Sequence, residues 1–146
     1  MTTIHMRSAL ASAALAAALV TAVPASAEML MFKADLKASS EVPVNDSKAT
    51  GNVDANYDTV AKKLSWTITS TGLTGAATAA HFHGPAEAGK NAGPVVPISG
   101  NLASPIKGEA TLTDAQATDL QAGKWYFNVH TAAHKDGEIR GQMMKK

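Results

Sequence analysis

Hydrophobic and polar residues alternate along much of the chain. In LMFKADLKA, which begins at Leu30, every second position is apolar and most positions between them are charged. A period of two predicts a β-strand with one buried face. The run KLSWTITS repeats this pattern with Leu64, Trp66 and Ile68 on one side. Further strand-like runs occupy residues 79–83, 95–98, 106–112, 124–131 and 137–143.

One helix is expected among these strands. Thr113 and Gln116 have the spacing of a capping box, the run DAQATDLQA follows over residues 114–122, and Gly123 stands where a helix would end. Residues 41–52 have the composition of turns and loops. About seven or eight short strands separated by Gly and Pro predict an all-β fold, an antiparallel immunoglobulin-like sandwich or Greek-key barrel with one short helix.

The beginning of the chain has the pattern of a secretory signal. Arg7 precedes an apolar run, and Ala25 and Ala27 supply the small side chains of a cleavage site. We expect residues 1–27 to be a signal peptide, residues 28–146 to form a single domain, and the mature protein to be periplasmic or secreted. No later stretch approaches the roughly 20 apolar residues of a membrane-spanning helix, so no membrane association is expected after cleavage.

Charge and cysteine content narrow the function further. Residues 28–146 contain 12 Lys and Arg against 12 Asp and Glu, a formal net charge near zero, and no run of basic residues. This balance argues against nucleic acid as a partner, and the sequence identifies no partner protein. The chain has no cysteine, which excludes disulfides, thiolate ligands and blue-copper centres.

The histidines fall into a pattern that suits a metal ion. In AHFHGP, alternation places His81 and His83 on one face of a strand and Phe82 on the other. In KWYFNVHT, the bulky apolar residues at alternate positions define the core face, so His130 lies on the opposite face. His134 follows in AAHKDG, an expected hairpin loop. The four side chains can converge only if the two strands are neighbours.

The chemistry of four imidazoles favours a late first-row transition metal. Imidazole nitrogens bind copper, zinc and nickel, and copper(II) binds most tightly in the divalent series. We therefore predict a metal site formed by His81, His83 and His130, with His134 as a fourth ligand. Copper is the expected ion, with zinc as the alternative. The competing interpretation is that the histidines only complete a hydrogen-bonded surface.

Two charged residues lie close to the last histidines in the sequence. GEIRGQ places Glu138 and Arg140 on one strand face, opposite to Ile139, and neighbouring opposite charges predict a modest surface ion pair. The alternative is a role at the metal site, in which Arg140 guides an anion or Glu138 orients a ligand histidine. Asn128, on the face of His130, is a second candidate for that orienting role.

Three motifs resemble the CHRD domain, a family named from chordin and common in exported bacterial proteins. AHFHGPAEAGKNAGPVV, WYFNVHT and GEIRGQ follow one another in the order of that family. The resemblance extends from about Asp35 to Gln142. It implies an all-β domain of immunoglobulin-like or barrel type, and it supplies no catalytic residues.

A second similarity concerns the geometry of the site alone. Copper–zinc superoxide dismutase, a β-sandwich, holds its copper partly through a His-x-His pair and a later histidine, and His81, His83 and His130 match those positions. This chain has no histidine between His83 and His130 and no cysteine. The bridging imidazole, the zinc loop and the disulfide therefore have no counterpart here.

Three functions are open on this reading of the sequence. The first is a periplasmic metal-binding domain that acts in copper storage, delivery or resistance. The second is an oxidoreductase that acts on superoxide or a related small oxidant at the same site. The third is a structural or interaction domain without metal. The sequence leaves open whether the protein is an enzyme, and the lack of a nucleophile motif argues against a hydrolase.

Overall fold

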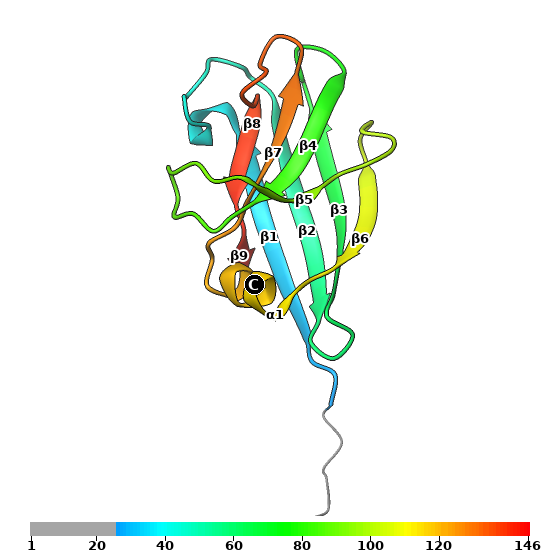
Figure 1. Ribbon diagram of the computed structural model, residues 1–146. Coiled ribbons are helices and arrows are strands. Elements are labelled where there is room, and N and C mark those ends of the chain that lie inside the picture. Colours follow the sequence, from blue (N-terminus) through cyan, green and yellow to red (C-terminus); the bar gives the residue numbers. More distant parts are fainter. Residues whose placement is uncertain (1–25) are drawn as a thin grey trace, which may run out of the picture.

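The structure is a computed structural model that describes residues 26–146, so the expected signal peptide lies outside the described residues except for its last two positions. These residues form β-strands joined by loops, with one 3₁₀ turn and one α-helix (Figure 1). The all-β class is confirmed. In chain order the elements are β1 (Met29–Lys37), η1 (Ala38–Ser40), β2 (Thr50–Asp58), β3 (Lys63–Thr71), β4 (Ala77–His83), β5 (Pro94–Pro97), β6 (Ile106–Thr111), α1 (Asp114–Gln121), β7 (Tyr126–Thr131), β8 (Ile139–Gln142) and β9 (Met144–Lys145).

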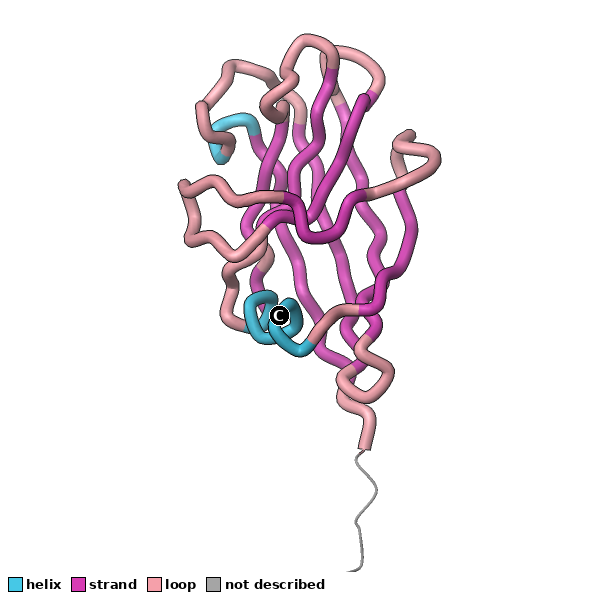
Figure 2. Tube along the Cα trace, in the orientation of Figure 1, coloured by secondary structure: helices cyan, strands magenta, loops and turns pink. Residues whose placement is uncertain are grey.

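The strands make one antiparallel sheet in the order β5-β4-β7-β8-β1-β2-β3-β6, with β9 paired to β1. The sheet curls into a nearly closed barrel. In Figure 1 β4 and β7 pass in front of β1 and β2, and Figure 2 shows the same curl as a continuous trace. The ring centroids of Trp66 on β3 and Phe82 on β4 lie 5.2 Å apart. Because these strands are not paired, this contact crosses the interior, and the core lies between the two halves of the sheet.

The side chains predicted on the core faces of the strands are buried. Burial alternates along the whole of β1, as the sequence pattern predicted. The apolar positions of β3 are buried in the same alternation. The aromatic and aliphatic core positions of β7 are buried too, but in this strand the side chains between them are also buried except for His130. The confirmed core residues are Leu30, Phe32, Ala34, Leu36, Leu64, Trp66, Ile68, Trp125, Phe127 and Val129.

One long strand was not predicted from the sequence. β2 pairs over nine positions with β1 and over nine with β3, and its first residues belong to the segment that was expected to be loop. Val53, Ala55 and Tyr57 alternate toward the core. The positions between them are Asn and Asp, which are depleted in strands. The two flanking strands hydrogen-bond this segment, and that pairing overrides its weak local preference for a strand.

The helix agrees with its sequence signals. The Thr113 hydroxyl accepts a hydrogen bond from the Gln116 N–H at 3.2 Å, and the Gln116 side chain accepts one from the Thr113 N–H at 2.9 Å. This reciprocal pair is the predicted capping box. At the other end Gly123 has φ +72°, a conformation that glycine adopts without strain. Within residues 26–146, no helix has the length and apolar character needed to cross a membrane.

Candidate metal centre

The strands that carry the histidines are neighbours, which was the condition for a shared site. β4 pairs antiparallel with β7, so that His81 lies opposite Asn128 and His83 lies opposite Tyr126. His130 is opposite Ala79 and therefore diagonal to His81. All three histidines lie on the face of the sheet that points away from the core. Alternation placed them on this face, and the pairing of β4 with β7 brings them together.

The three side chains converge closely. Each of His81, His83 and His130 offers a ring nitrogen, and these nitrogens all lie within 4.8 Å of one another. Nδ1 of His81 is 3.3 Å from Nε2 of His130. The ring centroid of His81 is 5.3 Å from that of His83 and 5.1 Å from that of His130. One ion could contact all three nitrogens.

His134 does not belong to this cluster. It lies in the loop between β7 and β8, where its N–H donates to the Thr131 carbonyl at 3.2 Å. Its own carbonyl accepts hydrogen bonds from the N–H groups of Thr131 and Gly137. The structure therefore brings together three of the four predicted ligands and places the fourth in the turn that shapes the hairpin.

Hydrogen bonds to the backbone fix the orientation of two of the rings. Nδ1 of His83 is 2.9 Å from the Ala92 carbonyl oxygen, and Nδ1 of His130 is 2.8 Å from the Lys135 carbonyl oxygen. A carbonyl oxygen only accepts hydrogen bonds, so both Nδ1 atoms carry the proton. In the neutral rings the lone pair is then on Nε2, which faces the cluster. Histidines that bind metals are commonly held in this way.

Burial also favours the neutral form of the histidines. It lowers the pKa of His81, and the charges of His130 and His83 lower it further. Burial lowers the pKa of His83 as well, although the hydrogen bonds that its charged form would make to Ala92 and Asn128 oppose the shift. Neutral imidazole is the form that coordinates metal ions.

Two further side chains complete the centre. Oδ1 of Asn128, which the sequence offered as a candidate for orienting a ligand histidine, lies 3.0 Å from Nε2 of His83 and 3.1 Å from Nε2 of His130. The ring of Tyr126 stacks on His83 with centroids 4.7 Å apart and an angle of 3° between the rings. No role was predicted for Tyr126, although it alternates with Asn128 and His130 on the same strand face. The hydrogen bonds to the backbone carbonyls of Ala92 and Lys135 could not be predicted from the sequence, because every residue has a carbonyl group.

The comparison with known families agrees with the resemblance of the three motifs. The family model of the CHRD domain matches residues 32–143. The chain belongs to the CHRD domain family. No curated protein and no solved structure matches the chain. The matched segment contains the three clustered histidines, so the centre lies inside the CHRD domain.

The prediction that Glu138 and Arg140 form an ion pair on the surface of the domain is wrong. Glu138 is 0% exposed and Arg140 is 2% exposed. The Arg140 guanidinium lies 3.4 Å above the centre of the Tyr126 ring, donates to Oδ1 of Asn91 at 2.8 Å and also donates to the Lys90 carbonyl. These bonds tie the loop between β4 and β5 to the outer face of the sheet. Loops cover this face, which is why side chains that alternation placed opposite the core are still buried.

Glu138 is held by hydrogen bonds from three separate segments. Its Oε1 accepts from the Ser47 hydroxyl at 2.7 Å and from the Thr74 N–H at 2.9 Å. Its Oε2 accepts from the hydroxyls of Thr74 at 2.8 Å and Thr131 at 2.6 Å. Burial alone would raise the pKa of Glu138, but these hydrogen bonds outweigh burial and lower it. The carboxylate organises the loops at the end of the domain that carries the histidines.

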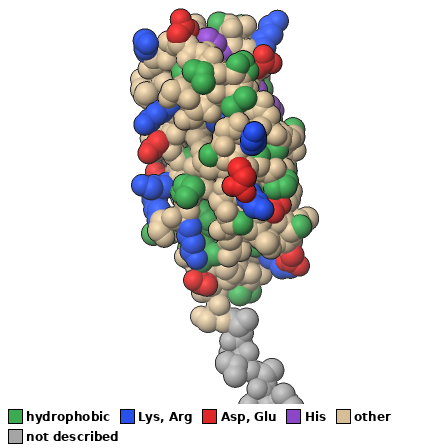
Figure 3. All heavy atoms as spheres, turned by 90° about the vertical axis from the view of Figure 1, so that its left-hand side faces the viewer, with side chains coloured by type: hydrophobic (Ala, Val, Ile, Leu, Met, Phe, Trp, Pro, Cys, Tyr) green, Lys and Arg blue, Asp and Glu red, His purple; other side chains and the backbone are tan. Residues whose placement is uncertain are grey.

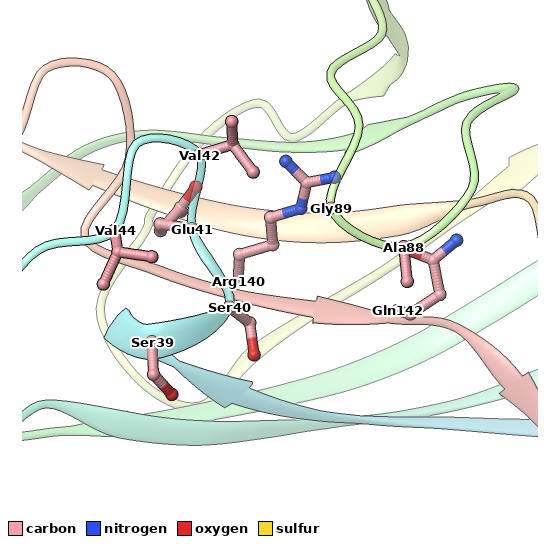
Figure 4. A pocket seen from close by; sticks show the side chains of 9 residues that line it. All are labelled: Ser39, Ser40, Glu41, Val42, Val44, Ala88, Gly89, Arg140 and Gln142. Carbon is pink, nitrogen blue, oxygen red and sulfur yellow. The ribbon is translucent and has the colours of Figure 1, made fainter.

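Small molecules can reach the histidine centre. His83, Asn128 and His130 line a cavity of about 300 Å³, together with Asp136 from the loop after β7. Figure 3 shows histidine atoms at the surface near the upper end of the molecule. A larger cavity of about 450 Å³ lies beside it and contains no histidine. In Figure 4 the Arg140 side chain rises from β8 through this larger cavity toward the loop that carries Gly89.

Glu41 is a buried carboxyl group beside the larger cavity. It is 2% exposed and lines the larger cavity. Burial raises its pKa to about 7, against the opposing effects of the Arg140 charge and of hydrogen bonds from the Val42 N–H and the Asn128 amide. A buried carboxyl group of this kind is protonated in mildly acidic solution and ionised in mildly alkaline solution.

Raising the pH is expected to destabilise the metal-free protein through Glu41. Its pKa is higher in the folded protein than in the unfolded chain, so the folded state binds more protons between pH 4.5 and about 7. The free energy of unfolding should fall by about 2–3 kcal/mol as the pH rises through this range. Urea unfolding with a chelator at pH 5 and pH 8 measures this difference. His81 and His83, whose pKa values are lowered by folding, change stability in the opposite direction over this range, so the effect of Glu41 is read from the difference in pH dependence between the wild type and Glu41→Gln. The exposed Glu109→Gln should keep the pH dependence of the wild type. An equal pH dependence in Glu41→Gln would contradict the assignment.

Proposed function

We propose that this CHRD domain binds one transition-metal ion at His81, His83 and His130, and that copper is its physiological metal. The observation that supports the proposal is the convergence of three ring nitrogens within 4.8 Å, from two paired strands. The backbone carbonyls that accept from Nδ1 of His83 and His130 leave Nε2 of each ring free to coordinate. Such an arrangement lowers the energy needed to reorganise the site on binding.

The choice of copper rests on ligand chemistry. Nitrogen ligands of the imidazole type suit copper(II), nickel(II) and zinc(II), and copper(II) forms the most stable complexes of this series. The site has no thiolate and no carboxylate among its three clustered ligands. Bound copper would supply a Lewis acid and a one-electron redox centre. The chain's own residues orient the imidazoles and exclude bulk water from one side of the site.

The proposal includes export. The pattern of residues 1–27 is that of a signal peptide with cleavage after Ala27. In the periplasm or outside the cell, a domain without cysteine that binds copper would store or deliver the metal or provide resistance to it. The intact mass of the exported protein tests the cleavage. Retention of residues 1–27 would remove this part of the proposal.

Elemental analysis tests the metal binding directly. Protein purified from the periplasm without a histidine tag is expected to contain about one copper ion per chain, or to take up one on titration. Competition among copper(II), nickel(II) and zinc(II) should follow the divalent series. A variant with alanine at His81, His83 and His130 should bind none of them specifically. Equal copper uptake by the wild type and the triple variant would overturn the proposal in favour of a structural role.

A second candidate function is an oxidoreductase that acts on superoxide or a related small oxidant. The observation in its favour is the cavity of about 300 Å³ beside His83 and His130, which leaves room for a small molecule next to a bound ion. Three protein ligands and an open position are typical of catalytic metal sites. The copper-loaded protein would have to consume superoxide faster than the triple alanine variant with the same amount of copper. Equal rates would leave metal binding as the function.

A further inference from the structure

We propose that the carboxamide oxygen of Asn128 is the fourth protein ligand of the metal centre, in the place that the sequence assigned to His134. The inference rests on the proposed metal binding and deepens it. Asn128 lies on β7 two residues before His130 and directly opposite His81 on β4. It therefore lies between the two strands that supply the histidines, on their face of the sheet.

The carboxamide oxygen of Asn128 is in contact with a ring nitrogen of each of His83 and His130, and all three atoms are electron-rich. Oδ1 of Asn128 lies 3.0 Å from Nε2 of His83 and 3.1 Å from Nε2 of His130. Because Nδ1 of each ring donates to a backbone carbonyl, the neutral rings point lone pairs from Nε2 toward the lone pairs of this oxygen. Such a contact is repulsive unless a positive charge lies between the atoms. Protons on both Nε2 atoms would place two positively charged rings next to each other, whereas one metal ion serves both nitrogens and the oxygen together.

Several distances between the candidate ligand atoms are those found between the ligands of one metal ion. Ligands about 2.0–2.1 Å from an ion and about 90–110° apart lie about 2.8–3.4 Å from one another. The distances from Oδ1 of Asn128 to the two Nε2 atoms, 3.0 and 3.1 Å, fall within this range. The distance of 3.3 Å from Nδ1 of His81 to Nε2 of His130 does so as well. Three of the six distances among these four atoms thus already have the values of a coordination shell, and the histidine nitrogens all lie within 4.8 Å of one another.

The other end of the Asn128 amide lies on the side of Glu41. Nδ2 of Asn128 and the carboxyl group of Glu41 both lie close to the place that a β-carbon on residue 137 would take, where it would overlap the carboxyl oxygen. Gly137 has φ +125°, which also requires glycine. Since Nδ2 lies on this side, Oδ1 points toward the histidines. Asn128 is 3% exposed, so water does not compete freely for the amide.

The resulting set has a definite chemical character. Three imidazole nitrogens with one neutral oxygen are ligands of the kind that copper(II) takes in a tetragonal arrangement. The cavity of about 300 Å³ adjoins His83, Asn128 and His130, so a fifth, exchangeable position can face it. An amide oxygen adds no charge, and the complex keeps the full positive charge of the ion.

Pulsed electron paramagnetic resonance on the copper(II)-loaded mature domain tests the assignment. The protein is prepared with ¹³C only at the carboxamide carbon of asparagine. Direct coordination through Oδ1 places this carbon about 3 Å from the ion and gives a strong ¹³C coupling. The coupling should disappear in Asn128→Asp, which removes the label but retains an oxygen ligand and copper binding. It should persist in Asn91→Asp, because Asn91 lines the same cavity and undergoes the same chemical change.

A second measurement uses affinity. Asn128→Leu removes the oxygen and is expected to weaken copper(II) binding by at least about 10-fold, the lower end of the effect of residues that only orient a ligand. Circular dichroism of the metal-free variant shows whether it is folded. If the wild type binds copper at the histidines but shows no strong ¹³C coupling, Asn128 only positions the imidazoles and this inference is wrong. If the wild type does not bind copper, the proposed function fails and the inference fails with it.

Discussion

Replacement of His81 by alanine is expected to weaken copper(II) binding by about 100-fold or more. Binding free energies of about 10–16 kcal/mol for four-ligand zinc sites correspond to about 3 kcal/mol per ligand, and 1.4 kcal/mol is about a tenfold change in affinity. The Nδ1 of His81 contacts only Nε2 of His130 among the hydrogen bonds of the described residues. Its removal therefore deprives the site of a ligand with little effect on the packing of the domain.

His130→Ala should weaken binding to a similar degree. His134→Ala is the matched control, because His134 is the remaining histidine of the described residues and lies outside the cluster. The affinity of the His134→Ala variant for copper(II) should equal that of the wild type. Isothermal titration calorimetry with a competing chelator measures all three variants. Unchanged binding in His81→Ala, or equal losses in His81→Ala and His134→Ala, would show that copper binds elsewhere on the chain.

The second large effect concerns stability. Glu138→Ala is expected to lower the free energy of unfolding by about 3–5 kcal/mol, because several buried donors each lose a hydrogen bond to a charged acceptor, worth about 1.5–3 kcal/mol, and not all of them find a new partner. The substitution leaves the hydroxyls of Ser47 and Thr131 and two donors of Thr74 without their acceptor. These donors come from three segments, so the loops around the histidine cluster should loosen together.

A fall in melting temperature of about 10–20 °C corresponds to this loss. Glu109→Ala is the matched control, since Glu109 pairs with Lys63 at 2.8 Å on the exposed side of the domain. Exposed pairs contribute about 0–1 kcal/mol. Because the pKa of Glu138 is lower in the folded protein, its stabilisation is present above the ordinary glutamate pKa and is lost as the pH falls through the lowered value. Melting curves of Glu138→Ala that match those of Glu109→Ala would refute the role of the carboxylate.

The alternative of a purely structural histidine cluster makes a different prediction for each experiment. In that case the imidazoles, Asn128 and Tyr126 would form a hydrogen-bonded and stacked surface that holds the loop between β4 and β5. His83→Ala would then lower stability, and copper would not raise the melting temperature of the wild type. Ligand binding to the folded state raises stability in proportion to the logarithm of metal concentration over Kd. A rise in melting temperature with copper therefore separates the two interpretations.

The fold class, most of the strands and the faces of those strands could be predicted from local sequence patterns. Side chains in a strand alternate with a fixed period, so Phe82 and Phe127 had to lie opposite His81, His83 and His130. The apolar residues of β1, β3 and β7 define the core for the same reason, and Thr113, Gln116 and Gly123 mark the helix. These signals are local. β2 escaped prediction because its Asn and Asp residues favour turns, and only hydrogen bonds from β1 and β3 make it a strand.

Which of these residues come into contact depends on the tertiary structure. Alternation assigns a side chain to a face but not to a neighbour, and the pairing of β4 with β7 brings His81 and His83 within reach of His130. The turn that binds the backbone of His134 keeps that residue out of the cluster. Loops folded over the outer face bury Glu138, which is why a pair predicted for the surface lies inside. Backbone carbonyls of Ala92 and Lys135 accept hydrogen bonds from His83 and His130. Every residue has such a carbonyl, so the residue types could not predict these contacts, which depend on the path of the backbone.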